Sequence, residues 1–233
     1  LMLAAVLAEG KTIIRNAASE PHIVDLGNFL NKMGGSISGH GTKEITIEGV
    51  EKLNGCEYEV VSDYIEAGTF LILSAMNGGG IEIEKAPLEN IENVIAKLKE
   101  AGFIVKNKDG NLILEGDDKP KAVDIETLPY PGFPTDLQSQ WMALMTIADG
   151  TSIIKETIWE NRFMHVPELN RMGADIKIEG NMAIVKGVEK LTSAPVMASD
   201  LRAGVALVMA ALVADGDTII DRIYHIDRGY EGL

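Results

Sequence analysis

The arginines of this chain gather in one stretch of the sequence. Five of the six lie between residues 162 and 228, in a chain whose formal net charge is −14. Arg202 follows Asp200 by two residues, where a helix is expected to begin, although the positive end of a helix dipole disfavours a cation. Arginine grips carboxylates and phosphates through paired hydrogen bonds. The cluster therefore indicates a pocket for a small, multiply anionic molecule, with ordinary ion pairs to Asp200, Asp221 and Asp227 as the alternative.

Two of these arginines occupy the same place in an internal repeat. Short segments rich in small residues recur at intervals of 70, 70 and 66 residues, and they end at Gly10, Gly80, Gly150 and Gly216. Arg162 lies twelve residues after the third of these glycines, and Arg228 lies twelve after the fourth. An internal period of this length indicates a structure built from repeated units.

Each unit reads as strand, helix, strand, strand, strand, helix, which predicts an α/β fold. A β-rich run follows each of the four glycines, and an amphipathic helix follows in the first three units. These helices are expected at 23–33 before Gly34, at 91–98 before Gly102, and up to Met172 before Gly173. Two short strands about a polar turn come next, for example at 174–177 and 182–185.

An acidic residue precedes the helix that closes each of the first three units. These residues are Asp63, Asp136 and Asp200. Asp is a strong N-cap, and helix capping alone would explain any one of them. Three in register predict helices that enter from one rim, where their positive ends would form an anion site. Four prolines between residues 117 and 134 predict an extended loop that leads into Asp136.

Composition excludes several classes of protein. With 233 residues and 46% apolar content, the chain can bury a sizeable core, as one large domain or two modest ones. A pI near 4.7 argues against a nucleic-acid partner or an anionic membrane surface. The longest apolar stretch, 204–214, is too short to span a bilayer. One cysteine excludes an internal disulfide and favours a cytoplasmic location, and four histidines without ligand spacing predict no metal or other cofactor.

Four separated motifs carry a family resemblance. They are Phe-Pro-Thr-Asp-Leu-Gln at 133–138, Glu-Asn-Arg-Phe-Met-His-Val-Pro-Glu-Leu at 160–169, Ser-Asp-Leu-Arg-Ala at 199–203 and Asp-Arg-Ile-Tyr-His-Ile-Asp-Arg-Gly-Tyr-Glu at 221–231. In this order they closely resemble the UDP-N-acetylglucosamine 1-carboxyvinyltransferases. The resemblance implies two domains, each an inside-out α/β barrel of repeated βαβαββ units. Residues 1–62 would end the first domain, and residues 63–233 would form most of the second.

The resemblance also implies a reaction. In this family the enolpyruvyl group of phosphoenolpyruvate passes to the 3-hydroxyl of UDP-N-acetylglucosamine by addition and then elimination, the first committed step of peptidoglycan synthesis. Asp136 would be the base that serves the sugar hydroxyl and later the methyl group. Asp200 would be the carboxylate beside the reacting centre. Such chemistry needs cations for the carboxylate and phosphate, and a carboxylate to move protons.

By the same resemblance, four residues would bind the substrates. Arg202 and Arg228 would hold phosphoenolpyruvate, and Arg162 would line the same cleft. The backbone of Ile158 would hold the nucleotide sugar. No nucleic acid or membrane is expected as a partner.

Some family features are absent from this chain. The reactive cysteine loop, a lysine–asparagine pair and a further arginine belong to the family's first domain and find no match here. Cys56 lacks basic neighbours that would lower its pKa, so we expect a structural role. The sequence begins within an expected helix and ends soon after Arg228, so we expect a fragment that is inactive by itself.

Two alternatives remain open. A shikimate-pathway enolpyruvyl transferase would share the architecture and phosphoenolpyruvate, but it is not expected to carry the motif at 160–169. A non-catalytic paralogue of the repeat fold would use its arginines only to balance charge, and it would bind no anion near Arg202 and Arg228.

Overall fold

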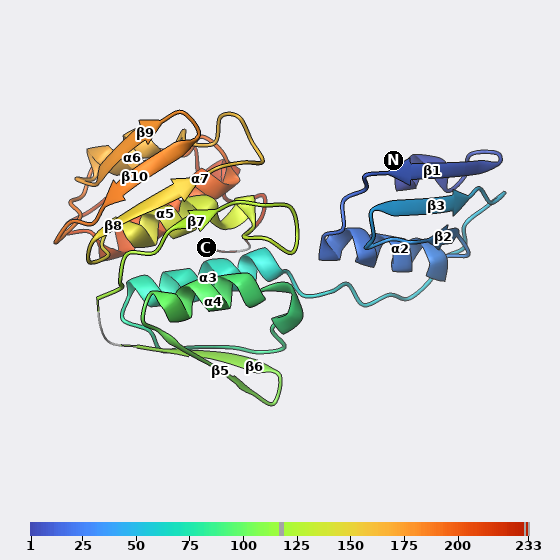
Figure 1. Ribbon diagram of the computed structural model, residues 1–233, viewed down its shortest axis with the longest axis horizontal. Helices are drawn as coiled ribbons and strands as arrows, with labels where there is room; N and C mark the ends of the chain where they lie inside the picture. The colour runs from blue at the N-terminus through green and yellow to red at the C-terminus, as the bar shows by residue number, and fades with distance from the viewer. Residues whose placement is uncertain (117–118, 231, 233) are drawn as a thin grey trace. The chain divides into compact units, whose positions relative to one another are not determined.

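The computed structural model describes residues 1–116, 119–230 and 232. The chain divides into two compact units (Figure 1), one formed by Leu1–Ser62 with Pro129–Pro131 and the other by Asp63–Leu128 with Gly132–Leu233. In the part of the chain that is described, no helix has both the length and the apolar character needed to cross a bilayer.

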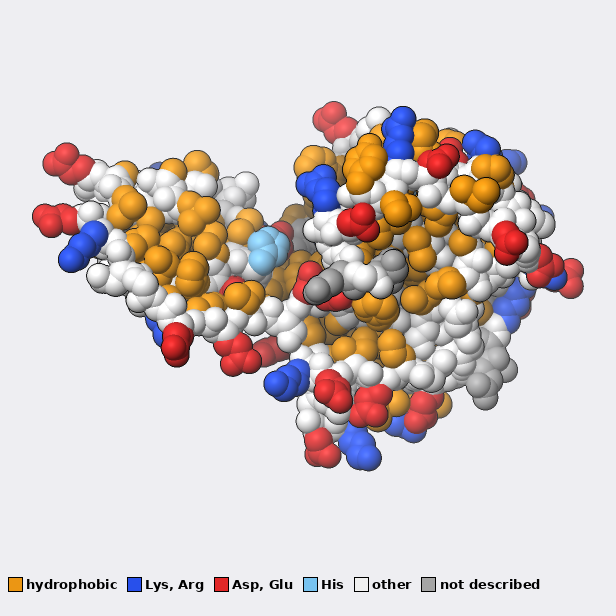
Figure 2. Space-filling view, turned by 180° about the vertical axis from the view of Figure 1, so that it is seen from behind, with side chains coloured by type: hydrophobic (Ala, Val, Ile, Leu, Met, Phe, Trp, Pro, Cys, Tyr) orange, Lys and Arg blue, Asp and Glu red, His pale blue; other side chains and the backbone are white. Residues whose placement is uncertain are grey.

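The first unit is a three-stranded antiparallel sheet with a helix on one face. Its elements are α1 (Met2–Ala5), β1 (Lys11–Arg15), α2 (Pro21–Lys32), β2 (Ser36–Ser38) and β3 (Glu44–Glu48). The strand order is β1-β3-β2. Ile45 and Ile47 of β3 alternate with exposed residues and pack with Leu30 of α2, because a strand turns every second side chain to the core. Apolar side chains gather on the surface of this unit (Figure 2). A hollow in the same unit is lined by apolar residues such as Leu3 and Leu26.

The second unit contains two complete repeats of the predicted order. In sequence its elements are α3 (Tyr64–Met76), β4 (Ile81–Ile83), η1 (Leu88–Asn90), α4 (Glu92–Glu100), β5 (Ile104–Lys108), β6 (Asn111–Glu115), β7 (Ile125–Glu126), η2 (Thr135–Leu137), α5 (Gln138–Met145), β8 (Thr151–Lys155), α6 (Val166–Arg171), β9 (Asp175–Glu179), β10 (Met182–Lys186), β11 (Val196–Met197), α7 (Leu201–Val213), β12 (Ile220–Asp221) and η3 (Ile223–His225). The repeats β4-α4-β5-β6-β7-α5 and β8-α6-β9-β10-β11-α7 confirm the predicted pattern.

The first period departs from that pattern. Residues 49–62, all of which are described, contain no strand before α3. In the two complete repeats, by contrast, the short strand at this place pairs in parallel with the first strand of the next repeat: β7 with β8, and β11 with β12. Residues 49–62 instead belong to the first unit, where Val50 and Leu53 pack against its core, so the prediction of a fourth strand here was wrong.

Helices fill the interior of the second unit and sheets cover it. Figure 1 shows α3, α4 and α5 between the β5–β6 hairpin and the β8–β10–β9 sheet. All eight residues of α5 are buried. In β8, by contrast, Ile154 is buried whereas Ile153 is 43% exposed. In an inside-out arrangement the helices are buried on all sides, and each strand has one face toward the helices and the other toward solvent. The predicted α/β class is confirmed.

A repeated glycine allows the chain to pass close to the end of a helix. Gly187, which begins a Gly-Val-Glu-Lys-Leu segment, donates its N–H to Gly150 O at 3.0 Å. Gly49 begins the same segment two periods earlier and donates to Gly10 O at 2.8 Å. A Cβ atom at Gly187 would clash with the carbonyl oxygen of Ala148, and one at Gly49 would clash with that of Ala8. The glycine of the repeat is therefore a packing requirement.

Gly187→Ala should destabilise the second unit by roughly 2 kcal/mol or more, because backbone must move to accept the methyl group. Both tryptophans, Trp141 and Trp159, lie in this unit, so tryptophan fluorescence during urea unfolding measures its stability. Gly55→Ala is the control, since a Cβ there meets nothing within 4 Å. Equal stability of the two variants would contradict the packing requirement.

Candidate active site

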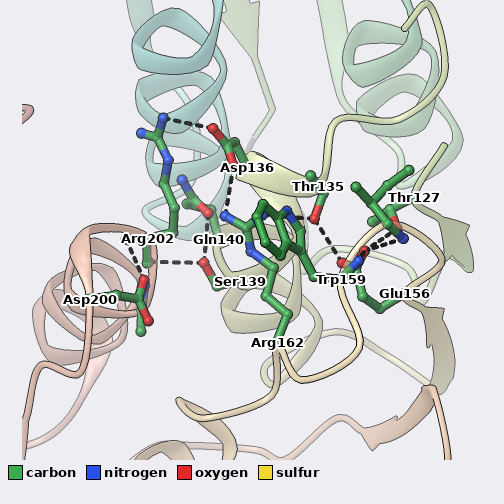
Figure 3. Close-up of polar contacts among 12 residues, drawn as sticks. Thr127, Thr135, Asp136, Ser139, Gln140, Glu156, Trp159, Arg162, Asp200 and Arg202 are labelled. Atoms are coloured by element: carbon green, nitrogen blue, oxygen red, sulfur yellow. Dashed lines mark hydrogen bonds and ion pairs between the residues drawn. The ribbon is translucent and has the colours of Figure 1, made fainter. Parts of the chain in front are cut away.

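Asp136 lies between two arginines (Figure 3). Its Oδ1 accepts a hydrogen bond from Arg162 Nη2 at 2.6 Å, and its Oδ2 accepts one from Arg202 Nη2 at 3.0 Å. The carboxylate side chain is 39% exposed, whereas the arginine side chains are 20% and 19% exposed. Two guanidinium groups share one carboxylate, so both retain N–H donors that are not bound to Asp136. The cluster can therefore attract a small anion from solvent.

The charges of this cluster stabilise one another. Burial alone would raise the pKa of Asp136, but Arg202 and Arg162 outweigh it through charge and hydrogen bonds and hold the pKa below its usual value. Burial likewise disfavours the charge of Arg202, but Asp136 and the phenol of Tyr230 outweigh it and raise the pKa of the guanidinium. Asp136 is therefore ionised at neutral pH and is a weak base while both arginines hold it.

Asp136 is not a helix cap, and the capping reading of this residue was wrong. It lies within the 3₁₀ turn η2, and the N-cap position of α5 is occupied by Leu137. Its two carboxylate oxygens are taken by the arginines. Asp63 does cap α3, since its Oδ1 accepts from the N–H groups of Ile65 at 2.8 Å and Glu66 at 3.2 Å.

Asp200 caps α7 and thereby fixes the position of Arg202 in the first turn of this helix. Its Oδ1 accepts from the backbone N–H groups of Arg202 and Ala203, both at 2.9 Å, and its Oδ2 accepts from Ser199 Oγ at 3.0 Å. This carboxylate at the helix N-terminus, together with Asp136 on the guanidinium, compensates the adverse position of Arg202. The structure thus places Asp200 next to Arg202 through backbone contact.

Arg202 also connects the first turns of two buried helices. Ser139, in the first turn of α5, donates its hydroxyl to the carbonyl oxygen of Arg202 at 2.9 Å. The phenol of Tyr230, which is 3% exposed, contacts both the Arg202 side chain and the hydroxyl of Thr69 in α3, the latter at 2.9 Å. Residues from α3, α5, α7 and the C-terminal segment therefore meet at one cluster.

Two expected site residues, Ile158 and Arg228, do not bond to Asp136, Arg162 or Arg202. The N–H of Ile158 donates to Glu156 Oε1 at 2.8 Å, so a ligand contact through this peptide group would use the carbonyl oxygen. Arg228 is exposed in the turn after η3. It makes no hydrogen bond or ion pair with any of the residues that the structure describes. The structure therefore joins Asp136, Asp200, Arg162 and Arg202. Arg228 bonds to none of them, although Tyr230, two residues later, contacts the Arg202 side chain. Glu231, which ends the same motif, lies outside the described residues.

Sequence reasoning missed Glu156, Thr135 and Tyr230. Thr135 accepts from Arg162 Nη1 at 2.9 Å and donates to Glu156 Oε2 at 2.9 Å. Glu156 is only 2% exposed. Its position directly after a strand gave no indication of burial, because glutamate is almost always exposed. The only indication for Thr135 in the sequence was its place beside Asp136 in the motif at 133–138.

The described residues form no metal site, and neither His165 nor Cys56 is a metal ligand candidate. In the described ranges, no three or more His, Cys, Asp or Glu side chains are placed to hold a metal ion together. His165 is buried with its Nε2 atom 3.2 Å from Met142 Sδ. Burial lowers its pKa to about 4, with a further contribution from Arg162 that Asp200 opposes. Cys56 is half-buried in the first unit.

This fold and this site define a member of the enolpyruvyl transferases. The family model for EPSP synthase (3-phosphoshikimate 1-carboxyvinyltransferase) matches residues 1–233, and the chain belongs to that family. Among solved structures, the enolpyruvyl transferase NikO from Streptomyces tendae is similar with a TM-score of 0.85 and 23% identity, over 98% of this chain and 55% of that one. An EPSP synthase from Acinetobacter baumannii is similar with a TM-score of 0.70 and 20% identity, over 98% and 56%. These likenesses show the fold.

Sequence relatives narrow the assignment. UDP-N-acetylglucosamine 1-carboxyvinyltransferase 1 of Caldanaerobacter subterraneus subsp. tengcongensis is 59% identical over 99% of this chain and 55% of its own length. The enzymes of that name from Actinobacillus pleuropneumoniae serotype 5b and Thermodesulfovibrio yellowstonii are 58% and 56% identical over the whole chain, and 55% and 56% of their own lengths are covered. The resemblance carried by the four motifs is confirmed. The chain spans about half the length of these relatives.

The buried His165 should make the second unit less stable in mild acid. Its folded pKa of about 4 lies below the value of an unfolded histidine, about 6.5, so the unfolded chain binds a proton that the folded chain excludes. Stability is therefore lost as pH falls from about 6.5 to about 4, by on the order of 3 kcal/mol for a fully expressed shift.

Tryptophan fluorescence during urea unfolding at several pH values measures this slope. His165→Gln should flatten it, whereas His22→Gln, at an exposed position in the first unit, should leave it unchanged. A slope that is the same in wild type and His165→Gln would show that His165 is not the group responsible.

Proposed function

We propose that the full-length protein containing this chain transfers the enolpyruvyl group of phosphoenolpyruvate to the 3-hydroxyl of UDP-N-acetylglucosamine. The observation that carries the proposal is the carboxylate of Asp136 held by Arg162 and Arg202, a base next to cations. Relatives that bear this enzyme's name are 56–59% identical over nearly the whole chain, which favours this substrate over shikimate 3-phosphate. The solved EPSP synthases share only 20–21% of their residues with it.

The two halves of the chain have different places in this proposal. Residues 1–62 belong to the end of the first domain of the full-length enzyme, and residues 63–233 form most of the second. All of the clustered site residues lie in the second unit. The substrates are the only partners proposed, and the enzyme would act in the cytoplasm.

The arginine cluster would recognise the anionic groups of phosphoenolpyruvate. Arg202 uses one Nη atom on Asp136, and a guanidinium carries five N–H donors, so further donors remain for a carboxylate or phosphate. Arg228 is exposed and would join Arg202 on the same ligand. An incoming anion competes with Asp136 for the Arg202 guanidinium. As that contact weakens, the pKa of Asp136 rises, and the carboxylate becomes a better base when the substrate is present.

Asp136 would then carry the proton transfers. In the addition step it takes the proton of the sugar 3-hydroxyl, the oxygen bonds to C2 of phosphoenolpyruvate, and C3 takes a proton from a separate general acid of the full-length enzyme. In the elimination step Asp136, which has lost its proton to solvent, takes a proton from the new methyl group. The electrons of that C–H bond form the C2–C3 double bond, the C2–O bond to phosphate breaks, and phosphate leaves with the electron pair. Asp200 keeps Arg202 at the start of α7 throughout.

Asp136→Asn should lower kcat by roughly 10²-fold or more in the full-length protein, because the amide cannot accept the hydroxyl proton. Phosphate release from phosphoenolpyruvate in the presence of UDP-N-acetylglucosamine measures the effect. Asp175→Asn is the matched control, since this aspartate is exposed on β9.

Three outcomes would contradict the proposal. Asp136→Asn with activity close to wild type would remove Asp136 from the base role. Phosphate release with shikimate 3-phosphate but not with UDP-N-acetylglucosamine would favour the shikimate-pathway alternative. No turnover with either acceptor, together with no binding of phosphoenolpyruvate, would favour the non-catalytic paralogue.

A further inference from the structure

We propose that Glu156 and Thr135 are positioning residues, which fix the guanidinium of Arg162 and, through it, the carboxylate of Asp136. The proposal rests on the proposed function for its catalytic consequence, whereas its geometric part stands on the second unit alone. Neither residue would touch the substrate. The effect of Thr135 would reach Asp136 through two hydrogen bonds in series, and that of Glu156 through three.

Glu156 is a buried carboxylate held only by neutral donors. Its Oε1 accepts from Thr127 Oγ1 at 2.8 Å, from the N–H of Ile158 at 2.8 Å and from the N–H of Trp159 at 3.1 Å. Its Oε2 accepts from Thr135 Oγ1 at 2.9 Å. Burying an ionised carboxylate is costly unless such bonds compensate it. A chain that merely needed to fill this space could use an amide or an apolar side chain at lower cost.

The hydrogen of the Thr135 hydroxyl has only one consistent direction. An arginine side chain donates and cannot accept, and an ionised carboxylate accepts and cannot donate. Thr135 lies between the two, 2.9 Å from Arg162 Nη1 and 2.9 Å from Glu156 Oε2. Its hydrogen must therefore point to Glu156 and a lone pair to Arg162. A hydroxyl polarised by a carboxylate is a stronger acceptor for the guanidinium.

Arg162 is held at two nitrogens as a result. Nη1 binds Thr135 and Nη2 binds Asp136, so the plane of the guanidinium is fixed and not only its position. Its Cζ atom also lies 6.0 Å from the centre of the Trp159 ring, and the N–H of Trp159 is bound by Glu156. One buried carboxylate thus binds two of the three neighbours of the guanidinium, Thr135 and Trp159 (Figure 3).

These hydrogen bonds form a relay, Glu156–Thr135–Arg162–Asp136, which ends on the carboxylate that is proposed to react. Asp136 is partly open to solvent, whereas Glu156 at the other end is buried. Removing the Thr135 hydroxyl takes away the hydrogen bond at Nη1, so the guanidinium can swing away from Asp136. A small misplacement of a catalytic carboxylate lowers the rate of a proton transfer steeply.

Thr135→Val in the full-length protein tests the relay, because valine keeps the shape of threonine and lacks the hydroxyl. We expect kcat to fall by about tenfold or more. We also expect the acid limb of the kcat–pH profile to move to higher pH, because Asp136 with a weaker hold from Arg162 has a higher pKa and needs a higher pH to act as a base. Thr135→Ser, which retains the hydroxyl, should restore both.

Thr146→Val is the matched control. Thr146, at the end of α5, is a fully buried threonine, whereas Thr135 is partly buried, and the Thr146 hydroxyl donates to Ala143 O at 2.6 Å, outside the relay's hydrogen bonds. It should lose stability without moving the acid limb. Glu156→Gln, which keeps shape and removes charge, should move the limb in the same direction as Thr135→Val. If Thr135→Val lowers stability but leaves kcat and the limb at their wild-type values, the relay is overturned.

A crystal structure of Thr135→Val separates this inference from the proposed function. We expect Arg162 Nη2 to lie beyond hydrogen-bond distance of Asp136 in the variant, whichever acceptor the enzyme uses. An unchanged contact would overturn the relay even in an active enzyme. A displaced Arg162 in a protein that releases no phosphate with UDP-N-acetylglucosamine would support the relay and contradict the proposed function.

Discussion

The site depends on a single carboxylate that is shared by two guanidinium groups. Asp136 accepts from Arg162 with one oxygen and from Arg202 with the other, and these three side chains come from three different segments of the chain. Each arginine is only about one-fifth exposed, and the shared carboxylate offsets both the cost of burying the two cations and their mutual repulsion. It also keeps the base weak until another anion takes over part of that role. Binding and proton transfer are thereby coupled in one ion cluster.

The inside-out fold brings these segments together. α5 and α7 are buried helices, and their first turns meet where Ser139 donates to the backbone of Arg202. Gly204, in the next part of α7, has room for no side chain because Ile226 packs against it, with a Cβ there only 2.7 Å from Ile226 Cγ1. The sheets that cover the helices supply Glu156 directly after β8. The same repeat therefore determines both how α5 and α7 pack in the core and where Arg202 and Glu156 lie.

Local patterns in the sequence predicted the repeat better than they predicted the partners of its charges. Helices α2, α4 and α6 end just before the expected glycines, and Asp63 and Asp200 cap as expected, because these are short-range effects of backbone geometry. The role of Asp136 could not follow from its neighbours, since its partners lie 26 and 66 positions away. The burial of Glu156 depends equally on distant threonines. The family motifs indicated which residues matter, but they did not say what each one contacts.

A titration of Asp136 with and without phosphoenolpyruvate tests the central claim most directly. The carboxyl carbon of Asp136 can be followed by ¹³C NMR in full-length protein, with Asp136→Asn to assign its resonance. The account predicts a pKa below the usual aspartate value in the free protein and a clear increase when phosphoenolpyruvate binds, because the ligand draws Arg202 away. A pKa that stays low with ligand bound would show that the arginines never release the base.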